Sequence, residues 1–361
     1  MVGTVSVGIV GLGSIGHSHA TRLTDTENGA TLVGGMDVAG DARDRFEREF
    51  DVPAYDTHEP LFAMADAVII TTPNRFHEEY AIGALDSGLD VLIEKPLAHT
   101  IDSAERIAER ARGTDRLCRV GFHNRVSEPV SVLMSYLEAG RFGDLYHIEA
   151  NYLRRRGIPG RGSWFTREDA AGGGALVDIG AHVIDLALYV LDFPEIASVS
   201  GITRSTFGDR SEYTYLDMHG TSGDGPFDVD DSANAFVRCS DGPTIALDVA
   251  WAANRPSNSA FVVRGSQAGA TLDLSTGELT IYETAGDGAP HFSDSEIRTT
   301  DDDPHAMEQQ QFIQAIATGD DDCLATPDQA LTTQQVMSAI YRSSETEDDI
   351  PIESKPVLTV D

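Results

Sequence analysis

Short apolar runs alternate with helical patterns through the first part of the chain, and this alternation limits the possible folds more than any other feature. The runs cover residues 5–10, 31–37, 67–72 and 91–94, and a helical segment follows each of them. Strands that alternate with helices form βαβ units, in which the strands are parallel and helices cover both faces of the sheet. We therefore predict a doubly wound parallel α/β sheet and assign residues 1–124 to it.

A glycine pattern lies between the first strand and the first helix. Gly11, Gly13 and Gly16 form G-x-G-x-x-G, and Ser14 and Ile15 begin the helix. The first glycine permits a tight turn, the second lets the backbone approach a pyrophosphate, and the third lets the helix pack closely on the strand. Because the first amides of a helix attract anions, the pattern predicts a dinucleotide site. The alternative is a tight turn without a ligand.

An acidic residue ends the second apolar run. Asp37 follows Gly16 by 21 residues, where a carboxylate accepts hydrogen bonds from the adenosine ribose hydroxyls. It would repel a ribose phosphate, so the sequence favours NAD over NADP as the cofactor. Arg43 and Arg45 lie further along the chain and favour NADP. The alternative role of Asp37 is to cap a loop.

Polar residues also follow the third and fourth apolar runs, at the carboxyl ends of strands where ligands bind in doubly wound sheets. Lys95 is one of only two lysines in the chain, and an ammonium group there can stabilise a substrate alkoxide. The alternative role of Lys95 is an ion pair with Glu94. The alternative for His77 is a structural position in the first turn of a helix. The segments 71–77 and 94–96 are candidates to contact a bound ligand, and they contain Thr72, Pro73, Asn74, His77, Glu94 and Lys95.

From about residue 125 the pattern changes to successive strands joined by short turns, which indicates an antiparallel sheet. Helical patterns at about 127–139 and 175–191 and two helices near the end of the chain accompany it. We assign residues 125–361 to an α+β domain with a large, mostly antiparallel open sheet. Its predicted strands include 145–153, 233–239, 244–251, 259–263, 270–274 and 278–283.

Asp178 and His182 are four residues apart on the predicted helix 175–191, so they share one face of it. A carboxylate beside an imidazole orients the ring and stabilises its protonated form, which suits a general base. The alternatives are a surface hydrogen bond and a pair of metal ligands. Since no third ligand stands at a suitable spacing, we predict no metal site.

The segment 152–165 carries four arginines within eight residues. Arginine side chains bind a carboxylate or phosphate, and a tryptophan ring stacks on a sugar ring, so we predict that this segment lines the substrate pocket. Ion pairs with the abundant acidic residues are the alternative. The candidate substrate residues are Arg154, Arg156, Arg161 and Trp164, together with His123 and Asn124 at the domain junction.

Acidic residues outnumber basic ones by 59 to 26, for a formal net charge of −33. Such a charge repels phosphates and anionic lipids, so we expect neither a nucleic acid nor a membrane partner. An acid-rich, lysine-poor chain is typical of proteins that work in molar salt, where ions screen the self-repulsion. We therefore expect a halophile's protein; an acidic protein that merely uses arginine is the alternative.

The three cysteines show no paired spacing, which argues against disulfides and zinc ribbons and for a reducing compartment. No apolar run approaches the ~18 residues of a membrane span, and no basic segment precedes the first apolar run. The expected location is the cytoplasm.

Four motifs together resemble the Gfo/Idh/MocA oxidoreductase family: GLGSIG at 11–16, TTPNRFH at 71–77, EKP at 94–96 and GGGALVDIGAHVID at 172–185. The resemblance covers nearly the whole chain. It implies a Rossmann domain followed by a domain whose open sheet commonly forms the oligomer interface, and hence a homodimer or homotetramer. It also implies Lys95, Asp178 and His182 as the catalytic set. By the same resemblance, the residues around the dinucleotide are Gly11, Gly13, Gly16, Asp37, Thr72, Asn74, His77 and Glu94.

These features predict an NAD-dependent dehydrogenase that oxidises a secondary hydroxyl or hemiacetal of a cyclic polyol, sugar or sugar acid. His182 takes the hydroxyl proton, Lys95 stabilises the alkoxide, Asp178 orients His182, and nicotinamide accepts the hydride. Two alternatives use the same residues or fold. One is a redox-neutral glycoside hydrolase that regenerates its NAD, and the other is a sugar or dinucleotide sensor without catalysis.

Overall fold

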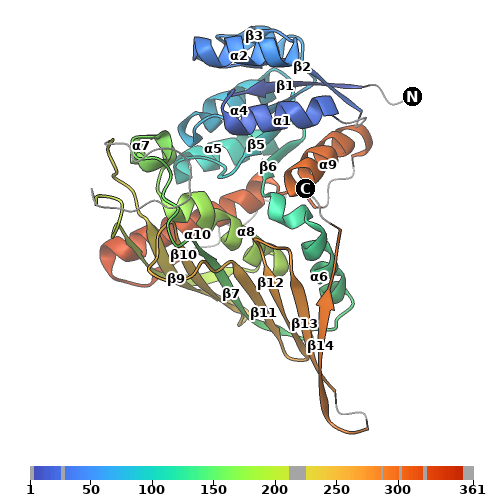
Figure 1. Cartoon of the computed structure of the whole chain (residues 1–361), viewed down its shortest axis with the longest axis vertical. Coiled ribbons are helices and arrows are strands. Elements are labelled where there is room, and N and C mark those ends of the chain that lie inside the picture. The colour runs from blue at the N-terminus through green and yellow to red at the C-terminus, as the bar shows by residue number, and fades with distance from the viewer. Residues whose placement is uncertain are drawn as a thin grey trace. The chain divides into compact units, whose positions relative to one another are not determined.

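The computed structural model describes residues 4–25, 29–210, 225–285, 288–300, 303–319 and 323–352, and Figure 1 labels the main elements. The chain divides into two compact units. Unit 1 consists of Met1–Ser127, Asp169–Gly172 and Asp301–Leu331, and unit 2 consists of Glu128–Glu168, Gly173–Thr300 and Thr332–Asp361.

Unit 1 contains a six-stranded sheet with the order β3-β2-β1-β4-β5-β6. All its strand pairs are parallel, so the predicted doubly wound sheet is confirmed. The strand order reverses between β1 and β4, which is where ligands bind in such sheets. The strands are β1 (Val5–Val10), β2 (Ala30–Met36), β3 (Ala54–Tyr55), β4 (Ala67–Ile70), β5 (Asp90–Glu94) and β6 (Cys118–Gly121).

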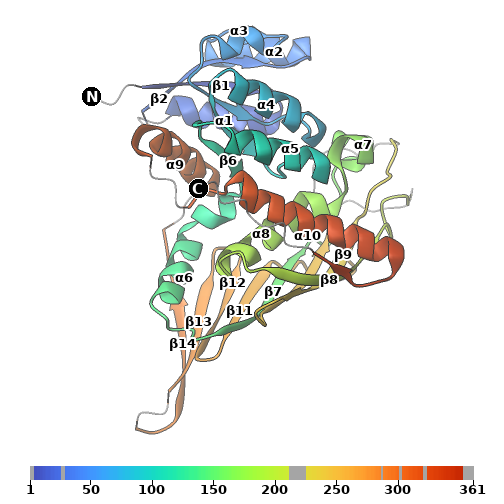
Figure 2. The ribbon, with the colours of Figure 1, turned by 180° about the vertical axis from the view of Figure 1, so that it is seen from behind.

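Helices cover both faces of this sheet, with α1 on one face and α4 and α5 on the other (Figures 1 and 2). The residues of β4 are all buried, and Ile9, Phe46 and Ile69 are among the fully buried side chains of this core. The elements are α1 (Ser14–Asp25), α2 (Gly40–Phe50), α3 (Glu59–Phe62), η1 (Asn74–Phe76), α4 (His77–Asp86), α5 (Ile101–Arg112) and η2 (His123–Val126).

Helix α9 (Pro304–Thr318) also belongs to unit 1, although it follows unit 2 in the chain. Its Phe312 and Ile313 are buried in the core of unit 1. A single domain boundary at residue 124 assigns α9 to the second domain and therefore misses this packing. Asp303 accepts hydrogen bonds from the amides of His305 and Ala306, and Gly319 ends the helix in the left-handed region. Aspartate and glycine are residue types typical of these two cap positions.

Unit 2 contains a nine-stranded sheet with the order β14-β13-β12-β11-β7-β10-β9-β8-β15. Its pairs are antiparallel except β7 with β10, which is parallel, so the expected mostly antiparallel sheet is confirmed. The strands are β7 (Leu145–Leu153), β8 (Ile196–Arg204), β9 (Ser232–Cys239), β10 (Thr244–Ala250), β11 (Ala260–Gly265), β12 (Ala268–Asp273), β13 (Leu279–Ala285), β14 (His291–Ile297) and β15 (Ile350–Pro351).

Helix α8 (Ala181–Val190) packs on this sheet and is buried along almost its whole length. Its burial explains the apolar composition of Glu168–Val190, which is long and apolar enough to cross a membrane but is mostly buried inside the protein. The other helical elements after residue 127 are α6 (Glu128–Glu138), η3 (Trp164–Thr166), α7 (Glu168–Ala171), the π-helix η4 (Leu176–Gly180) and α10 (Pro327–Thr346).

Candidate active site

The glycine loop of unit 1 has the geometry of a phosphate cradle. A Cβ on Gly11, whose φ is +96°, would lie 2.8 Å from the amide of Thr72, and one on Gly16 would lie 2.0 Å from the carbonyl oxygen of Gly11. A Cβ on Gly13 would meet no atom within 4 Å. Packing therefore requires the outer two glycines, whereas the middle one leaves the surface open.

The exposed start of α1 adds hydrogen-bond donors to this cradle. Gly13, Ser14 and Ile15 are exposed, and the first amides of a helix have no acceptor within the helix. An anion there meets both these amides and the positive end of the helix. The loop therefore fits the pyrophosphate of a dinucleotide.

Asp37 lies directly after β2, beside the glycine loop. One carboxylate oxygen accepts from the amide of Leu12 and the other from the amide of Ala39, both at 2.8 Å. Since each carboxylate oxygen can accept more than one hydrogen bond, ribose hydroxyls can still bind. Arg43 and Arg45 donate to the backbone carbonyls of Asp37 and Leu12, so both arginines help to hold the loop.

Asn74 and His77 connect the loops after β4 and β5 to their surroundings. Pro73 precedes η1, in which Asn74 is buried and donates to the carbonyl of Ala171 at 2.8 Å. The buried His77 ring has its nitrogens 3.0 Å from the carbonyl oxygens of Thr72 and Pro96. Burial lowers the pKa of His77, and the neutral ring has one N–H, which donates to one of these two carbonyls.

Thr72 has unused hydrogen-bonding capacity. Its Oγ1 is buried and has no hydrogen-bond partner within the described ranges. A buried hydroxyl without a partner is costly unless a ligand completes it. This observation supports a cofactor group beside the carboxyl end of β4.

Lys95 follows β5 beside a cluster of ionisable side chains in unit 1. Glu94 Oε1 lies 3.0 Å from Nε2 of the buried His19, on α1. Burial alone would raise the pKa of Glu94, but the hydrogen bond to His19 and the nearby His305 and Lys95 lower it. Glu94 is therefore an ionised neighbour of Lys95 at neutral pH.

Two further histidines lie near this pair. His123 in η2 stacks on His305 of α9, with ring centroids 3.8 Å apart. Burial and His305 lower the pKa of His123 to about 3, so its ring is neutral at pH 7. Asn124 is in the same 3-10 turn, where its carbonyl accepts from the Ser127 hydroxyl. The sequence offered no signal for His305, because this residue reaches His123 only when α9 packs within unit 1.

Asp178 and His182 lie in unit 2, on the two parts of one helical segment. The expected single α-helix is instead the π-helix η4, which carries Asp178, followed by α8, which carries His182. Wider π-helical turns are frequent at functional sites. His182 is buried, with 7% of its surface exposed.

Two side chains of unit 2 hold the Asp178 carboxylate. The indole Nε1 of the fully buried Trp251 donates to Asp178 Oδ2 at 2.8 Å, and Arg154 Nη1 lies 3.9 Å from the same oxygen. A charged partner and a donor both favour the ionised carboxylate. Sequence reasoning missed Trp251, which follows β10 and is 73 residues from Asp178.

In the arginine-rich segment 152–165, some polar side-chain groups have partners among the described residues and others have none. Arg156 donates to the carbonyls of Arg155 and Ala253, and its guanidinium lies 4.9 Å from the ring centroid of Phe207. Arg154 lies against Asp178, so ion pairing accounts for part of this cluster, as the alternative interpretation held. Buried atoms without a hydrogen-bond partner in the described part of the chain include Arg161 Nε and Ser163 Oγ, and the Trp164 ring stacks on Phe165 at 3.8 Å.

Among the residues that the structure describes, no group of three or more His, Cys, Asp or Glu side chains can hold a metal ion. Lys95 belongs to unit 1, whereas Asp178, His182 and the arginine-rich segment belong to unit 2.

Comparison with known proteins agrees with this division. Residues 5–122 match the family model described as an oxidoreductase family with an NAD-binding Rossmann fold, and residues 131–271 match the GFO/IDH/MocA C-terminal domain. The D-glucoside 3-dehydrogenase of Escherichia coli K12 is 30% identical over 345 residues, which cover 94% of this chain and 95% of that protein.

Two further proteins extend the comparison. The scyllo-inositol 2-dehydrogenase (NAD(+)) of Bacillus subtilis 168 is 30% identical over 232 residues, which cover 61% of this chain and 66% of that protein. Among solved structures, levoglucosan dehydrogenase in complex with NADH has the same fold, with a TM-score of 0.84 at 21% identity over 97% of this chain and 99% of that one.

Proposed function

This chain belongs to the GFO/IDH/MocA family of oxidoreductases with an NAD-binding Rossmann fold, and we propose that it oxidises a secondary hydroxyl or hemiacetal of a cyclic sugar, polyol or sugar acid. The observation that carries the proposal is the Asp178 carboxylate, held by Trp251 and Arg154 four residues before His182. The names of the relatives, which include a glucoside and an inositol dehydrogenase, support the substrate class.

In the proposed reaction the C–H and O–H bonds of the substrate alcohol break and a carbonyl bond forms. His182 takes the hydroxyl proton, and the ionised Asp178 stabilises the imidazolium that results. The Lys95 ammonium stabilises the negative charge that develops on the oxygen. NAD, when bound, would supply the hydride acceptor, and the amides of Gly13 to Gly16 and the carboxylate of Asp37 would hold the dinucleotide.

The test is reduction of NAD, followed by absorbance, in molar KCl with inositols, aldoses, glucosides, sugar acids and sugar phosphates. Lys95→Met should lower kcat at least 100-fold while the Kd of NAD stays within threefold. The matched control is Lys355→Met, which removes the only other lysine and should leave both constants unchanged. Unchanged turnover of Lys95→Met contradicts the proposal, and glycoside cleavage without net NADH indicates the redox-neutral hydrolase instead.

We propose NAD as the cofactor in preference to NADP because of the Asp37 carboxylate. A ribose phosphate at that position would meet this negative charge at close range. Titration calorimetry should therefore give a lower Kd for NAD than for NADP. A lower Kd for NADP would contradict the assignment and indicate that Arg43 or Arg45 leaves its carbonyl partner to bind the phosphate.

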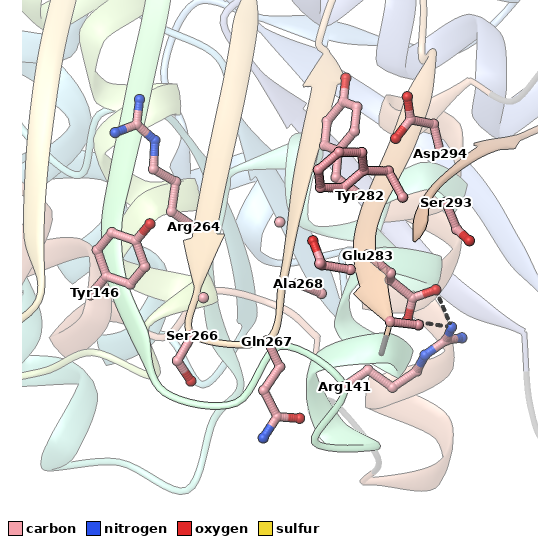
Figure 3. A pocket seen from close by; sticks show the side chains of 15 residues that line it. Arg141, Tyr146, Arg264, Ser266, Gln267, Ala268, Tyr282, Glu283, Ser293 and Asp294 are labelled. Carbon is pink, nitrogen blue, oxygen red and sulfur yellow. Dashed lines mark hydrogen bonds and ion pairs between the residues drawn. The ribbon is translucent and has the colours of Figure 1, made fainter. Parts of the chain in front are cut away.

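We also propose that the sheet of unit 2 forms a homo-oligomer interface. Exposed aromatic side chains lie on it, among them Tyr146, Tyr282 and Phe292, the last with 84% of its surface exposed. They line a hollow of about 920 Å³ together with the Arg141–Glu283 ion pair (Figure 3). Such an exposed apolar area is typical of interaction sites.

Light scattering after gel filtration in molar KCl tests this interface. We expect a dimer or tetramer for the natural chain and a smaller species for Tyr282→Glu and Phe292→Glu. Met64→Glu, at an exposed apolar position of unit 1, is the control that should keep the natural mass. A monomeric natural chain contradicts the proposal.

We further propose that the protein works in the cytoplasm of a cell with high internal salt. The net charge of −33 supports this, because the self-repulsion of so many carboxylates falls as ions screen it. Circular dichroism during dialysis from molar KCl into dilute buffer is the test. We expect loss of structure, and full retention of the folded state would contradict the proposal.

A further inference from the structure

Asp230 lies in unit 2 and contacts the beginning of the segment that carries Asp178 and His182. Its Oδ1 accepts from the amide of Gly174 at 2.8 Å and its Oδ2 from the amide of Leu176 at 2.9 Å. Its backbone carbonyl accepts from the amide of Ala175 at 3.0 Å. Three consecutive amides at the start of the helical segment therefore bind a single residue from a distant part of the chain.

These contacts replace an ordinary helix cap. The first amides of a helix need acceptors from outside the helix, and the residue before η4, Ala175, has no side chain that can supply one. Asp230 is buried and supplies them instead. The same contacts explain two glycines, since a Cβ on Gly174 would lie 1.8 Å from the carbonyl oxygen of Asp230 and one on Gly173 would lie 2.1 Å from the Tyr341 hydroxyl.

Tyr341 holds the carboxylate from the other side. Its hydroxyl donates to Asp230 Oδ1 at 2.6 Å from helix α10. Burial and the nearby charge of Asp230 hold the pKa of Tyr341 well above its usual value, so the hydroxyl remains a donor. Asp230 is thus surrounded by three donors to its two carboxylate oxygens.

The path from Asp230 to Asp178 is short. Gly174 donates its amide to Asp230, and its own carbonyl accepts from the amide of Asp178 at 2.9 Å. The neighbouring residue acts on the other side of Asp178, because the carbonyl of Asp231 accepts from the amide of Trp251 at 2.9 Å, and the Trp251 indole binds the Asp178 carboxylate. Adjacent residues therefore fix both the backbone and the side-chain partner of Asp178.

We propose that Asp230 is a positioning residue for proton transfer, with Tyr341 as its support: its carboxylate fixes the first turn of η4 and thereby the place of Asp178 and His182. The inference rests on the proposed function, in which these two residues carry the proton. It assigns a role to Gly173 and Gly174, which keep space for Tyr341 and Asp230 next to the backbone.

The test uses Asp230→Asn and Tyr341→Phe in the full chain. An asparagine in the same orientation keeps one acceptor oxygen but presents an NH₂ group to the Leu176 amide, which can no longer bind. We expect kcat to fall at least 10-fold for Asp230→Asn and about 3-fold for Tyr341→Phe, with the Kd of NAD unchanged. The apparent pKa of the base in the pH profile of kcat should shift by at least half a unit, because a displaced Asp178 stabilises imidazolium less.

Two control variants lose comparable hydrogen bonds in unit 2 without contact with this segment. Asp273 accepts from Ser259, Ser275 and Thr276, in each case at Oδ1, so Asp273→Ala removes these hydrogen bonds and is the control for Asp230→Asn. Ser343 on α10 donates to the carbonyl of Asp348 and accepts from the amide of Gly201, so Ser343→Ala matches Tyr341→Phe. Both controls should keep kcat within twofold and the natural pH profile.

A double-mutant cycle with Trp251→Phe separates positioning from general loss of structure. If both variants act through Asp178, the double variant should lose less kcat than the product of the two single losses. A folded Asp230→Asn enzyme with the kcat and pH profile of Asp273→Ala would overturn the inference. If Asp230→Asn does not fold, the same readouts on Tyr341→Phe decide.

The variant Asp178→Asn distinguishes this inference from the function on which it rests. Loss of turnover in Asp178→Asn with natural turnover in Asp230→Asn refutes only the positioning role. Natural turnover in Asp178→Asn refutes the proposed function, and the positioning role fails with it.

Discussion

Gly13 and Gly16 stand three residues apart in one motif, and the structure predicts opposite outcomes for the same substitution at the two positions. The Cβ of Gly16→Ala would lie 2.0 Å from the carbonyl oxygen of Gly11 and 2.8 Å from Thr71 Oγ1. The nearer atom is backbone, so no change of rotamer relieves the contact. The Cβ of Gly13→Ala would meet no atom within 4 Å.

The magnitudes follow from these contacts. Overpacking costs about 1–3 kcal/mol or more, and the 2.0 Å contact belongs at the upper end, while alanine in a helix returns about 1 kcal/mol relative to glycine. We therefore expect Gly16→Ala to lower the free energy of unfolding by about 2 kcal/mol. Gly13→Ala should change it by less than about 0.5 kcal/mol.

NAD binding should respond differently. The methyl group of Gly13→Ala would occupy the surface that a pyrophosphate must approach to reach the first amides of α1. Losing one hydrogen bond to a charged group costs about 1.5–3 kcal/mol, which corresponds to a Kd raised roughly 10- to 150-fold. The expected pattern is weak NAD binding at natural stability.

The assays are denaturant unfolding without cofactor and titration calorimetry with NAD, both in molar KCl. A natural Kd for Gly13→Ala would show that the dinucleotide does not approach this glycine. Equal losses of stability in the two alanine variants would show that the packing argument for Gly16 is wrong.

Two further predictions concern Trp251 and His77. Trp251→Phe removes the indole donor to Asp178, so kcat should fall about 10-fold or more at unchanged Kd for NAD, as a charge-assisted hydrogen bond implies; natural kinetics would show that the contact is dispensable. Burial lowers the folded-state pKa of His77, so the contribution of this histidine to the free energy of unfolding is complete above about pH 6.5. The contribution is lost as the pH falls, by at most about 1.4 kcal/mol per pH unit. His77→Gln should therefore weaken the fall in unfolding free energy between pH 7 and 5.5, whereas the exposed His291→Gln should not; identical slopes in urea unfolding would contradict the reasoning.

Several elements escaped prediction because their sequences lack the usual periodicity. β14 has the sequence HFSDSEI and no buried residue, so no apolar alternation identifies it as a strand. β8 contains Ser198, Ser200 and Gly201, which weaken the same signal. The π-helix η4 was expected to be part of an α-helix, since the two share the apolar pattern of a buried helical segment.

The sequence by itself determined the parallel sheet, the glycine loop with Asp37 at its side, and the motifs of the family. These are local properties: burial imposes apolar periodicity along a strand or helix, and a close contact or a positive φ demands glycine at its own position. Only the tertiary structure decided which side chains hold the site residues. Trp251 lies 73 residues from Asp178, His19 lies 75 from Glu94, and Tyr341 lies 111 from Asp230. No local pattern encodes such contacts, because they arise only when strands and helices pack.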